Sequence, residues 1–215
     1  IYKNDLDFSL TGKAYNSDQN TLVTSIPRYI TNLIAAKQAS TVITNEAELL
    51  DLSKRIATPT NYISGNFPFW VANHLVHRRG DANGEKPYFF AVRMENDRTQ
   101  GPEDASTPRL AWHAGSGLLQ PRVRGNEHGA NTRKNWDWHA LPGLTEEWRT
   151  DAIPAVNGVD ETGGSAYSGM VSDGRYGCAA MEYRSRGTYS AACANKAWFF
   201  TETEAVALGS AVSRR

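Results

Sequence analysis

The 215-residue sequence lacks the features that mark several large functional classes. No apolar run approaches the ~20 residues that a helix needs to cross a bilayer, so we predict no membrane span. Its 23 Lys and Arg residues balance 23 Asp and Glu residues. This balance argues against a general nucleic-acid or anionic-membrane binder, although a local basic groove remains open. The motifs G-x-S-x-G and H-E-x-x-H and a glycine-rich phosphate loop are also absent, and we predict neither a metal nor a cofactor.

Cysteine is scarce. The two cysteines, Cys178 and Cys193, lie fifteen residues apart on segments that we predict to be neighbouring strands. They do not have the Cys/His spacing of a zinc site. A disulfide in an oxidising compartment and a pair of buried free thiols are both compatible with this spacing.

The first sixty residues have the pattern of amphipathic helices. Hydrophobic residues make up 40% of the chain, with six Trp, nine Tyr and seven Phe, which is enough for a core. A polar residue followed by an early proline, Ser25 and Pro27, predicts one helix start. A second helix is predicted to begin at Asn45, with Glu48 as a capping-box partner, and to end before Pro59.

After residue 65 the pattern changes to short segments rich in aromatic and β-branched residues and separated by turn residues. We predict strands at Phe67–Asn73, Leu75–Arg79, Tyr88–Glu95, Leu110–His113, Tyr167–Ser172, Tyr176–Arg184, Lys196–Phe200 and Ala205–Leu208. Many strands without alternating helices favour an antiparallel β-sandwich over a parallel α/β sheet. The predicted fold is therefore mainly β, with a helical segment at residues 1–60 and an antiparallel β-sandwich at residues 61–215.

Polar residues are dense in three places: Asp7–Lys13, His77–Arg79, and Arg122–Gly129 with the Trp136–Trp138 segment that follows. A basic run such as the second is more often a solvated face, and strand alternation lets at most two of its three side chains share a site. The Trp-Asp-Trp segment favours packing over binding, with both indoles on one strand face. Glu127 lies among cationic residues and could hold an arginine or lysine in a fixed pose, or form a surface ion pair.

Five blocks of the sequence, in order, resemble polysaccharide lyase family 8, which comprises the hyaluronate, chondroitin and xanthan lyases. The first resembles the stretch that carries an active-site arginine, the second the first central-sheet strands, and the third a Trp-Asp-Trp…Pro-Gly-Thr signature. The blocks are Asp7–Lys13, Phe69–Arg79 with Tyr88–Met94 and Asn96–Thr99, Asn135–Thr145, Gly169–Gly177 and Lys196–Gly209.

The resemblance implies an α/α toroid followed by large antiparallel sheets, with a cleft between them that cleaves uronic-acid polysaccharides by β-elimination. Abstraction of the uronate C5 proton by a base builds negative charge on the carboxylate, so neutralising donors must lie there. An acid then returns a proton to the departing glycosidic oxygen. The implied partner is an anionic polysaccharide, without nucleic acid or membrane, and the implied location is secreted or periplasmic.

The resemblance assigns roles to individual residues. Glu127 matches the glutamate that reaches into the cleft from the sheet domain, and we predict that it is an orienting carboxylate. Lys13 stands where an arginine is usual; it keeps the charge but loses the bidentate fork. Ser17 stands where a second arginine is expected. Glu127 and Lys13 are therefore the predicted catalytic residues.

Asn126, Arg124 and His77 are weaker candidates for the rim of the cleft. No block matches the asparagine, histidine and tyrosine that the family carries in its toroid. The general base is thus expected outside these residues, and Tyr15 is the one nearby tyrosine that could substitute. The chain is predicted to be part of a lyase that works with a missing helical domain or segment. The alternative is a non-catalytic carbohydrate-binding or structural sandwich derived from such a lyase.

Overall fold

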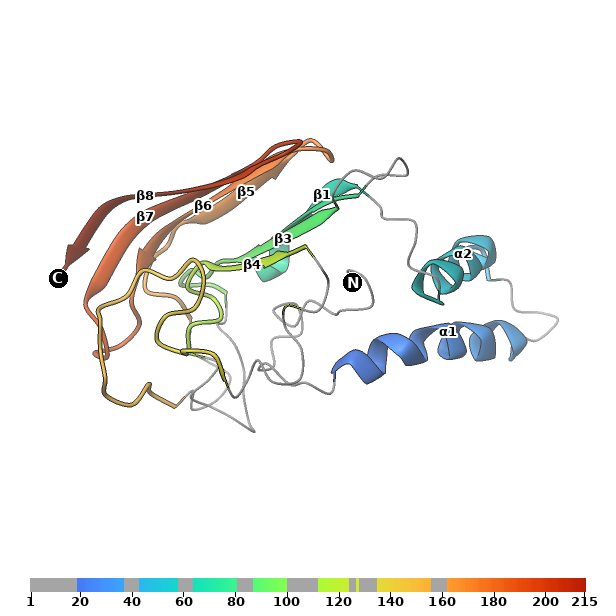
Figure 1. Cartoon of the computed structure of the whole chain (residues 1–215), viewed down its shortest axis with the longest axis horizontal. Helices are drawn as coiled ribbons and strands as arrows, with labels where there is room; N and C mark the ends of the chain where they lie inside the picture. The colour runs from blue at the N-terminus through green and yellow to red at the C-terminus, as the bar shows by residue number, and fades with distance from the viewer. Residues whose placement is uncertain are drawn as a thin grey trace.

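The computed structural model describes residues 19–36, 43–57, 64–80, 87–99, 112–123, 127, 135–155 and 162–215. Within them the chain forms two helices followed by two four-stranded antiparallel sheets. Figure 1 shows one sheet lying over the other, with both helices at the side away from strand β8. The predicted mainly-β sandwich with N-terminal helices is confirmed. Residue 60 lies outside the described residues, so the domain boundary stays a prediction.

Helices α1 (Gln19–Ala35) and α2 (Glu46–Ala57) pack against each other. The predicted start of α1 at Ser25 is wrong, because the helix begins six residues earlier and Pro27 lies inside it. Proline lacks a backbone N–H, so the helix continues through Pro27 with one backbone hydrogen bond fewer. The predicted start of α2 at Asn45 is confirmed to within one residue, and the Asn45 carbonyl accepts the backbone N–H of Leu49 at 2.9 Å.

The first sheet has the order β1-β2-β3-β4, with strands Gly65–Phe69, His74–Arg79, Tyr88–Arg93 and Leu118–Arg122. A short 3₁₀ turn, Trp70–Ala72, ends β1 earlier than predicted, and Asn73 after it is left-handed, with φ 47°. The strand predicted at Leu110–His113 is wrong in its described part, because Trp112 and His113 form a turn. Strand β4 was not predicted.

The second sheet has the order β5-β6-β7-β8, with strands Ser168–Ser172, Gly177–Arg184, Ala192–Phe200 and Ala205–Arg214. All four strands were predicted, although β7 begins four residues earlier and β8 ends six residues later than expected. The predicted Asp173–Gly174 turn joins β5 to β6, and Gly174 has the φ of +88° that glycine tolerates best.

The main core lies between the two sheets. Strand alternation turns Trp198 of β7 inward, 2% exposed, and Phe199 outward, 42% exposed. The inward apolar residues of both sheets meet in one cluster, made by Leu75, Val92, Met94, Ala179, Met181, Tyr183, Ala192, Trp198 and Phe200.

The Trp-Asp-Trp segment packs as predicted but is not a strand. Trp136 and Trp138 contact edge to face at 5.7 Å and lie against a second buried cluster that includes Trp112 and Leu141. The segment is a turn, in which the Asp137 carboxylate accepts the backbone N–H of His139 at 3.0 Å. A turn can gather both indoles on one side without strand alternation.

The strand register decides between the two states of the cysteines. Cys178 lies opposite Phe199, and Cys193 lies opposite Arg184, so the two cysteines are six positions apart along β6 and β7. At ~3.3 Å per residue this separation is about 20 Å, far beyond the ~7 Å limit between the Cα atoms of a disulfide. Both thiols are free.

Candidate functional site

Glu127 lies just beyond the end of β4. Its side chain is exposed, and its Oε1 accepts the backbone N–H of Val123 at 2.7 Å. A charge-assisted hydrogen bond of this kind holds a carboxylate in a defined position. The geometry thus places an anchored acid at the edge of the first sheet, where β4 has no further strand beside it among the described residues.

Four of the predicted site residues fall outside the described part of the chain: Lys13, Tyr15, Arg124 and Asn126. Their roles stay predictions.

His77 lies in the interior between the two sheets rather than at an open rim. Its Nε2 is 2.9 Å from the Thr201 carbonyl oxygen, which can only accept, so Nε2 carries the proton. Its Nδ1 is then the acceptor for the Asn66 amide at 3.2 Å. The ring also stacks on Phe200, with 5.3 Å between centroids. His77 of β2 thereby connects the first sheet to the turn between β7 and β8.

Burial of His77 lowers its pKa to about 4 from an ordinary value of 6.5. The charges nearest to it, Arg79 and Glu202, form an ion pair at 3.2 Å. The uncharged ring is therefore the form that the folded protein accepts.

The free energy of unfolding is expected to fall as the pH drops from 6.5 toward 4, because unfolded His77 takes up a proton that the folded state refuses. The His77 contribution to this slope approaches about 1.4 kcal/mol per pH unit. In His77→Gln, the glutamine amide can still donate to Thr201 but does not titrate, so the slope should be shallower. Urea unfolding across this pH range measures both slopes. Equal slopes would show that His77 is not neutral in the folded state.

A second polar group, the Lys196 cluster, consists of the buried side chains of Glu95, His113, Glu146, Arg186 and Lys196. Lys196 points inward from β7, between Ala194 and Trp198. Arg186 follows β6, and the other three members lie on the connecting segments around the first sheet.

Ion pairs and hydrogen bonds give the charged side chains of the Lys196 cluster polar partners. The Lys196 ammonium donates to the carbonyls of Ser116, at 3.2 Å, and Gly143. Arg186 lies 3.3 Å from the Glu95 carboxylate. The Tyr183 hydroxyl donates to Glu146. These contacts tie the segments around residues 116 and 143 to the second sheet.

Burial shifts the pKa values within the Lys196 cluster toward the neutral forms. It raises the pKa of Glu146 to about 7 and that of Glu95 above its usual range. It lowers the pKa of Lys196 to about 8 and that of His113 to about 3. A polymer cannot reach side chains this deeply buried, so the cluster supports the fold rather than reacting with substrate. Sequence reasoning missed it because its members are spread from residue 95 to residue 196, and an inward lysine on β7 was the only local signal.

The described residues contain neither a membrane-spanning helix nor a cluster of metal ligands. None of the helices there has the length and apolar character needed to cross a membrane. The same residues hold no group of three or more His, Cys, Asp or Glu side chains that could bind a metal ion.

Comparison with known proteins gives matches at three levels. The family model described as polysaccharide lyase family 8, super-sandwich domain, matches residues 64–215. Chondroitinase-AC of Pedobacter heparinus is 32% identical over 147 residues, which cover 67% of this chain and 19% of that protein.

Two solved structures have the same fold. The chondroitin AC lyase of Streptomyces coelicolor A3, in complex with chondroitin sulphate, superposes with a TM-score of 0.68 at 18% identity, over 100% of this chain and 34% of that one. A Paenibacillus xanthan lyase gives a TM-score of 0.67 at 19% identity, over 100% of this chain and 22% of that one. The chain thus spans between a fifth and a third of the length of these proteins.

Proposed function

The chain belongs to polysaccharide lyase family 8, and on this premise we propose that it contributes the sheet domain of an enzyme that cleaves a uronate-containing polysaccharide by β-elimination. The observation that carries the proposal is the match of residues 64–215 to the super-sandwich domain of that family. The proposed partner of this domain is a helical toroid, in the same protein or in another chain, which supplies the general base.

The chemistry assigns work to the residues of this chain. Glu127 is proposed to orient a cationic group or the sugar at the cleft, from its anchored position after β4. Lys13 is proposed to neutralise the uronate carboxylate as a point charge while the C5 proton leaves. Asn126 and Arg124 are proposed to contact the sugar beside Glu127. His77 is proposed to contribute from the interior, because its hydrogen bond to Thr201 connects the first sheet to the second.

The proposed substrate class is a glycosaminoglycan. Support comes from the name of the Pedobacter heparinus relative and from the chondroitin sulphate bound in the Streptomyces coelicolor A3 structure. Because such polymers lie outside cells, the proposed location is secreted or periplasmic.

A second candidate function is binding of the same glycans without cleavage. By the resemblance of the Asp7–Lys13 segment, Lys13 and Ser17 stand where arginines are expected, and the chain covers 19% of Chondroitinase-AC. An arginine can hold the uronate carboxylate with two parallel hydrogen bonds. Because negative charge develops on that carboxylate mainly in the transition state, loss of the arginine weakens catalysis more than it weakens binding.

To test the proposal, the protein that contains this chain is incubated with chondroitin sulfate, hyaluronan or alginate while the ultraviolet absorbance of the unsaturated uronate is followed. Lys13→Met should lower turnover by a factor that corresponds to a few kcal/mol, about a hundredfold, and Lys13→Arg should keep or raise it. Glu127→Gln should lower turnover at an unchanged melting temperature. Glycan binding without any growth in absorbance would favour the second candidate. A Lys13→Met variant as active as the parent would remove Lys13 from the mechanism.

A further inference from the structure

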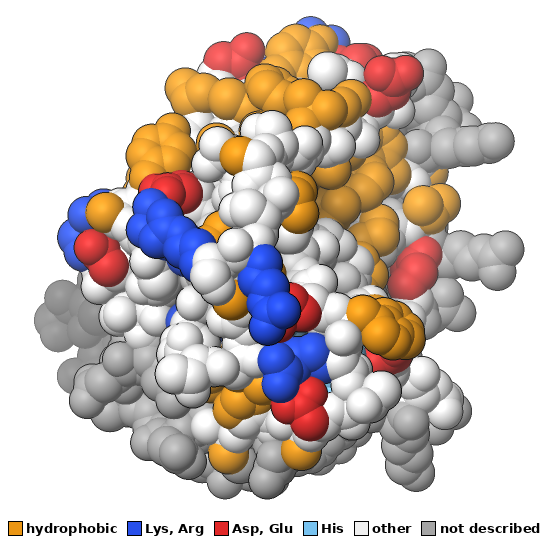
Figure 2. Space-filling model, turned by 90° about the vertical axis from the view of Figure 1, so that its left-hand side faces the viewer, with side chains coloured by type: hydrophobic (Ala, Val, Ile, Leu, Met, Phe, Trp, Pro, Cys, Tyr) orange, Lys and Arg blue, Asp and Glu red, His pale blue; other side chains and the backbone are white. Residues whose placement is uncertain are grey.

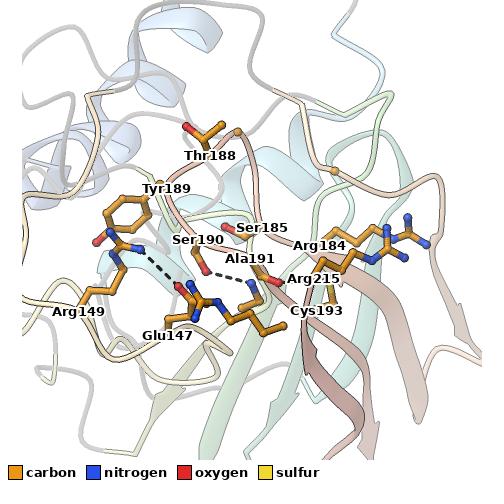
Figure 3. A pocket seen from close by; sticks show the side chains of 14 residues that line it. Glu147, Arg149, Arg184, Ser185, Thr188, Tyr189, Ser190, Ala191, Cys193 and Arg215 are labelled. Atoms are coloured by element: carbon orange, nitrogen blue, oxygen red, sulfur yellow. Dashed lines mark hydrogen bonds and ion pairs between the residues drawn. The ribbon is translucent and has the colours of Figure 1, made fainter.

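A pocket of about 420 Å³ lies at the end of the second sheet that is remote from Glu127. Its walls come from the ends of β6, β7 and β8, from the β6–β7 turn, and from the segment around Arg149 (Figure 3). The volume falls within the range of roughly 300–1,000 Å³ that is usual for ligand pockets. It is large enough for one sugar unit with a charged substituent.

Strand register shows that this pocket and Glu127 lie at different ends of the two sheets. Glu127 comes after Arg122, which pairs with Phe89 at the end of the first sheet where Tyr88 also lies. The Tyr88 hydroxyl donates to the carbonyl of Thr201, just beyond the last residue of β7. The pocket lies at the first residues of β7. Strand β7 has nine residues, so eight steps of ~3.3 Å separate its two ends by about 26 Å. The pocket is therefore distinct from the Glu127 region.

Arginine dominates the charge of the pocket. The four arginines that line it are Arg149, Arg184, Arg214 and Arg215, and its only lining carboxylate among the described residues is Glu147. Figure 2, which views the molecule from the side of the C-terminal strands, shows Lys and Arg side chains gathered on this face with Asp and Glu between them.

Neighbouring carboxylates hold the guanidinium groups in place without cancelling them. Asp151 accepts two parallel bonds from Arg149, at 2.8 and 2.7 Å, and Glu147 lies 2.7 Å from Nε of Arg214. Ser165, Arg184 and Arg215, in this order, hold the pKa of Glu182 below its usual range. The four guanidinium groups of the lining thus have three carboxylates near them, those of Glu147, Asp151 and Glu182. Because each guanidinium carries five N–H donors, donors remain for an anion.

The uncharged part of the lining suits a sugar. Hydroxyl side chains of Ser185, Thr188 and Ser190 line the pocket, and the ring of Tyr189 lies 4.8 Å from the guanidinium carbon of Arg149. Hydroxyls exchange hydrogen bonds with sugar hydroxyls, and the Tyr189 ring, with Arg149 over one face, adds apolar surface and a polar tip to the lining. An inorganic ion alone would need neither of these features.

We propose that this pocket binds one anionic sugar unit, carrying a sulfate ester or a carboxylate, of the polysaccharide on which the protein acts. It is a second glycan site, at the end of β7 opposite to the end that Tyr88 contacts. The identity of the glycan rests on the proposed function, whereas the preference for an anionic sugar rests on the pocket itself. A long polymer could occupy both sites at once, which would raise its effective concentration at the cleft.

The chain carries its own reporter for the test. Cys193 lines the pocket, whereas Cys178 lies six positions away along the paired strands, and both thiols are free and half-buried. A chondroitin sulfate tetrasaccharide should slow the alkylation of Cys193 by iodoacetamide and leave the alkylation of Cys178 unchanged, whereas the uncharged maltotetraose should protect neither. Equal alkylation rates of Cys193 with and without the sulfated probe would overturn the proposal.

Variants then test the arginines. In Arg184→Gln/Arg215→Gln, half-protection of Cys193 should need about tenfold more tetrasaccharide, because two charge-assisted donors are lost. The control is Arg98→Gln, which removes an exposed arginine paired with Asp97 and should leave half-protection unchanged. Thr188→Trp, at an exposed position of the β6–β7 turn, should block the pocket without a change of charge. Half-protection at the parent concentration in both pocket variants would contradict the proposal.

The lyase proposal and the proposed second glycan site can be refuted independently of each other. Glu127→Gln should reduce formation of the unsaturated product while protection of Cys193 persists. Protection without any product in the parent protein would support the pocket and count against the lyase proposal. Product formation without protection would support the lyase proposal and overturn the pocket.

Discussion

Replacing Lys196 with methionine is expected to lower the free energy of unfolding by about 3–5 kcal/mol, because it removes one partner from a buried ionic group. The ammonium contacts the carbonyls of Ser116 and Gly143, and its charge lowers the cost of burying Glu146 and Glu95. Methionine fills a similar volume, so the expected loss comes from uncompensated polar groups rather than from a cavity. Equilibrium unfolding in urea measures it.

A matched control uses Lys54, an exposed lysine of α2. Lys54→Met should change the free energy of unfolding by no more than about 0.5 kcal/mol, as is usual for surface substitutions. Lys196→Met could instead lower the free energy of unfolding by no more than Lys54→Met. The hydrogen bonds from Lys196 to Ser116 and Gly143 would then not contribute to stability.

Truncation of Trp198 is expected to be comparably severe, at about 3–5 kcal/mol, because its indole is lost from the core between the sheets. Trp198 is 2% exposed and contacts the main apolar cluster. Its neighbour Phe199 points to the other face of the same strand and is 42% exposed.

Phe199→Ala is therefore the control for Trp198→Ala, and should cost about 1 kcal/mol or less, since less apolar area leaves water in the folded state. Both variants can be compared by chemical denaturation under identical conditions. Equal losses would contradict the assignment of the two faces of β7.

Residue composition and turn residues were sufficient to predict most of the fold. Seven of the eight strands that the structure describes overlap predicted segments, because these segments are rich in aromatic or β-branched residues and are separated by turns that contain Gly, Asp or Asn. Strand β4 escaped prediction because none of its residues is aromatic or β-branched, and because its Pro121 cannot donate to a ladder. The structure accommodates this proline on an edge strand, beside Phe90 of β3.

The polar residues were harder to place from sequence. His77 belongs to a basic run, which predicts a surface position, yet its partners Asn66 and Thr201 come from distant segments and bury it. The Lys196 cluster has the same property, since each of its contacts joins residues that are far apart in the chain. A sequence pattern can predict a strand from neighbouring residues. The hydrogen-bond partners of a buried polar side chain, in contrast, come from distant segments that only the tertiary structure brings together.

The most direct test of the central claim is whether the protein that contains this chain forms unsaturated uronate from chondroitin sulfate. Elimination leaves a double bond in the sugar at the new non-reducing end, and this bond absorbs ultraviolet light, whereas hydrolysis leaves none. We expect the absorbance to grow with chondroitin sulfate and to stay flat with dextran, which has no uronate. Shortening of the polymer without growth in absorbance, or no change in any uronate polymer, would contradict the account.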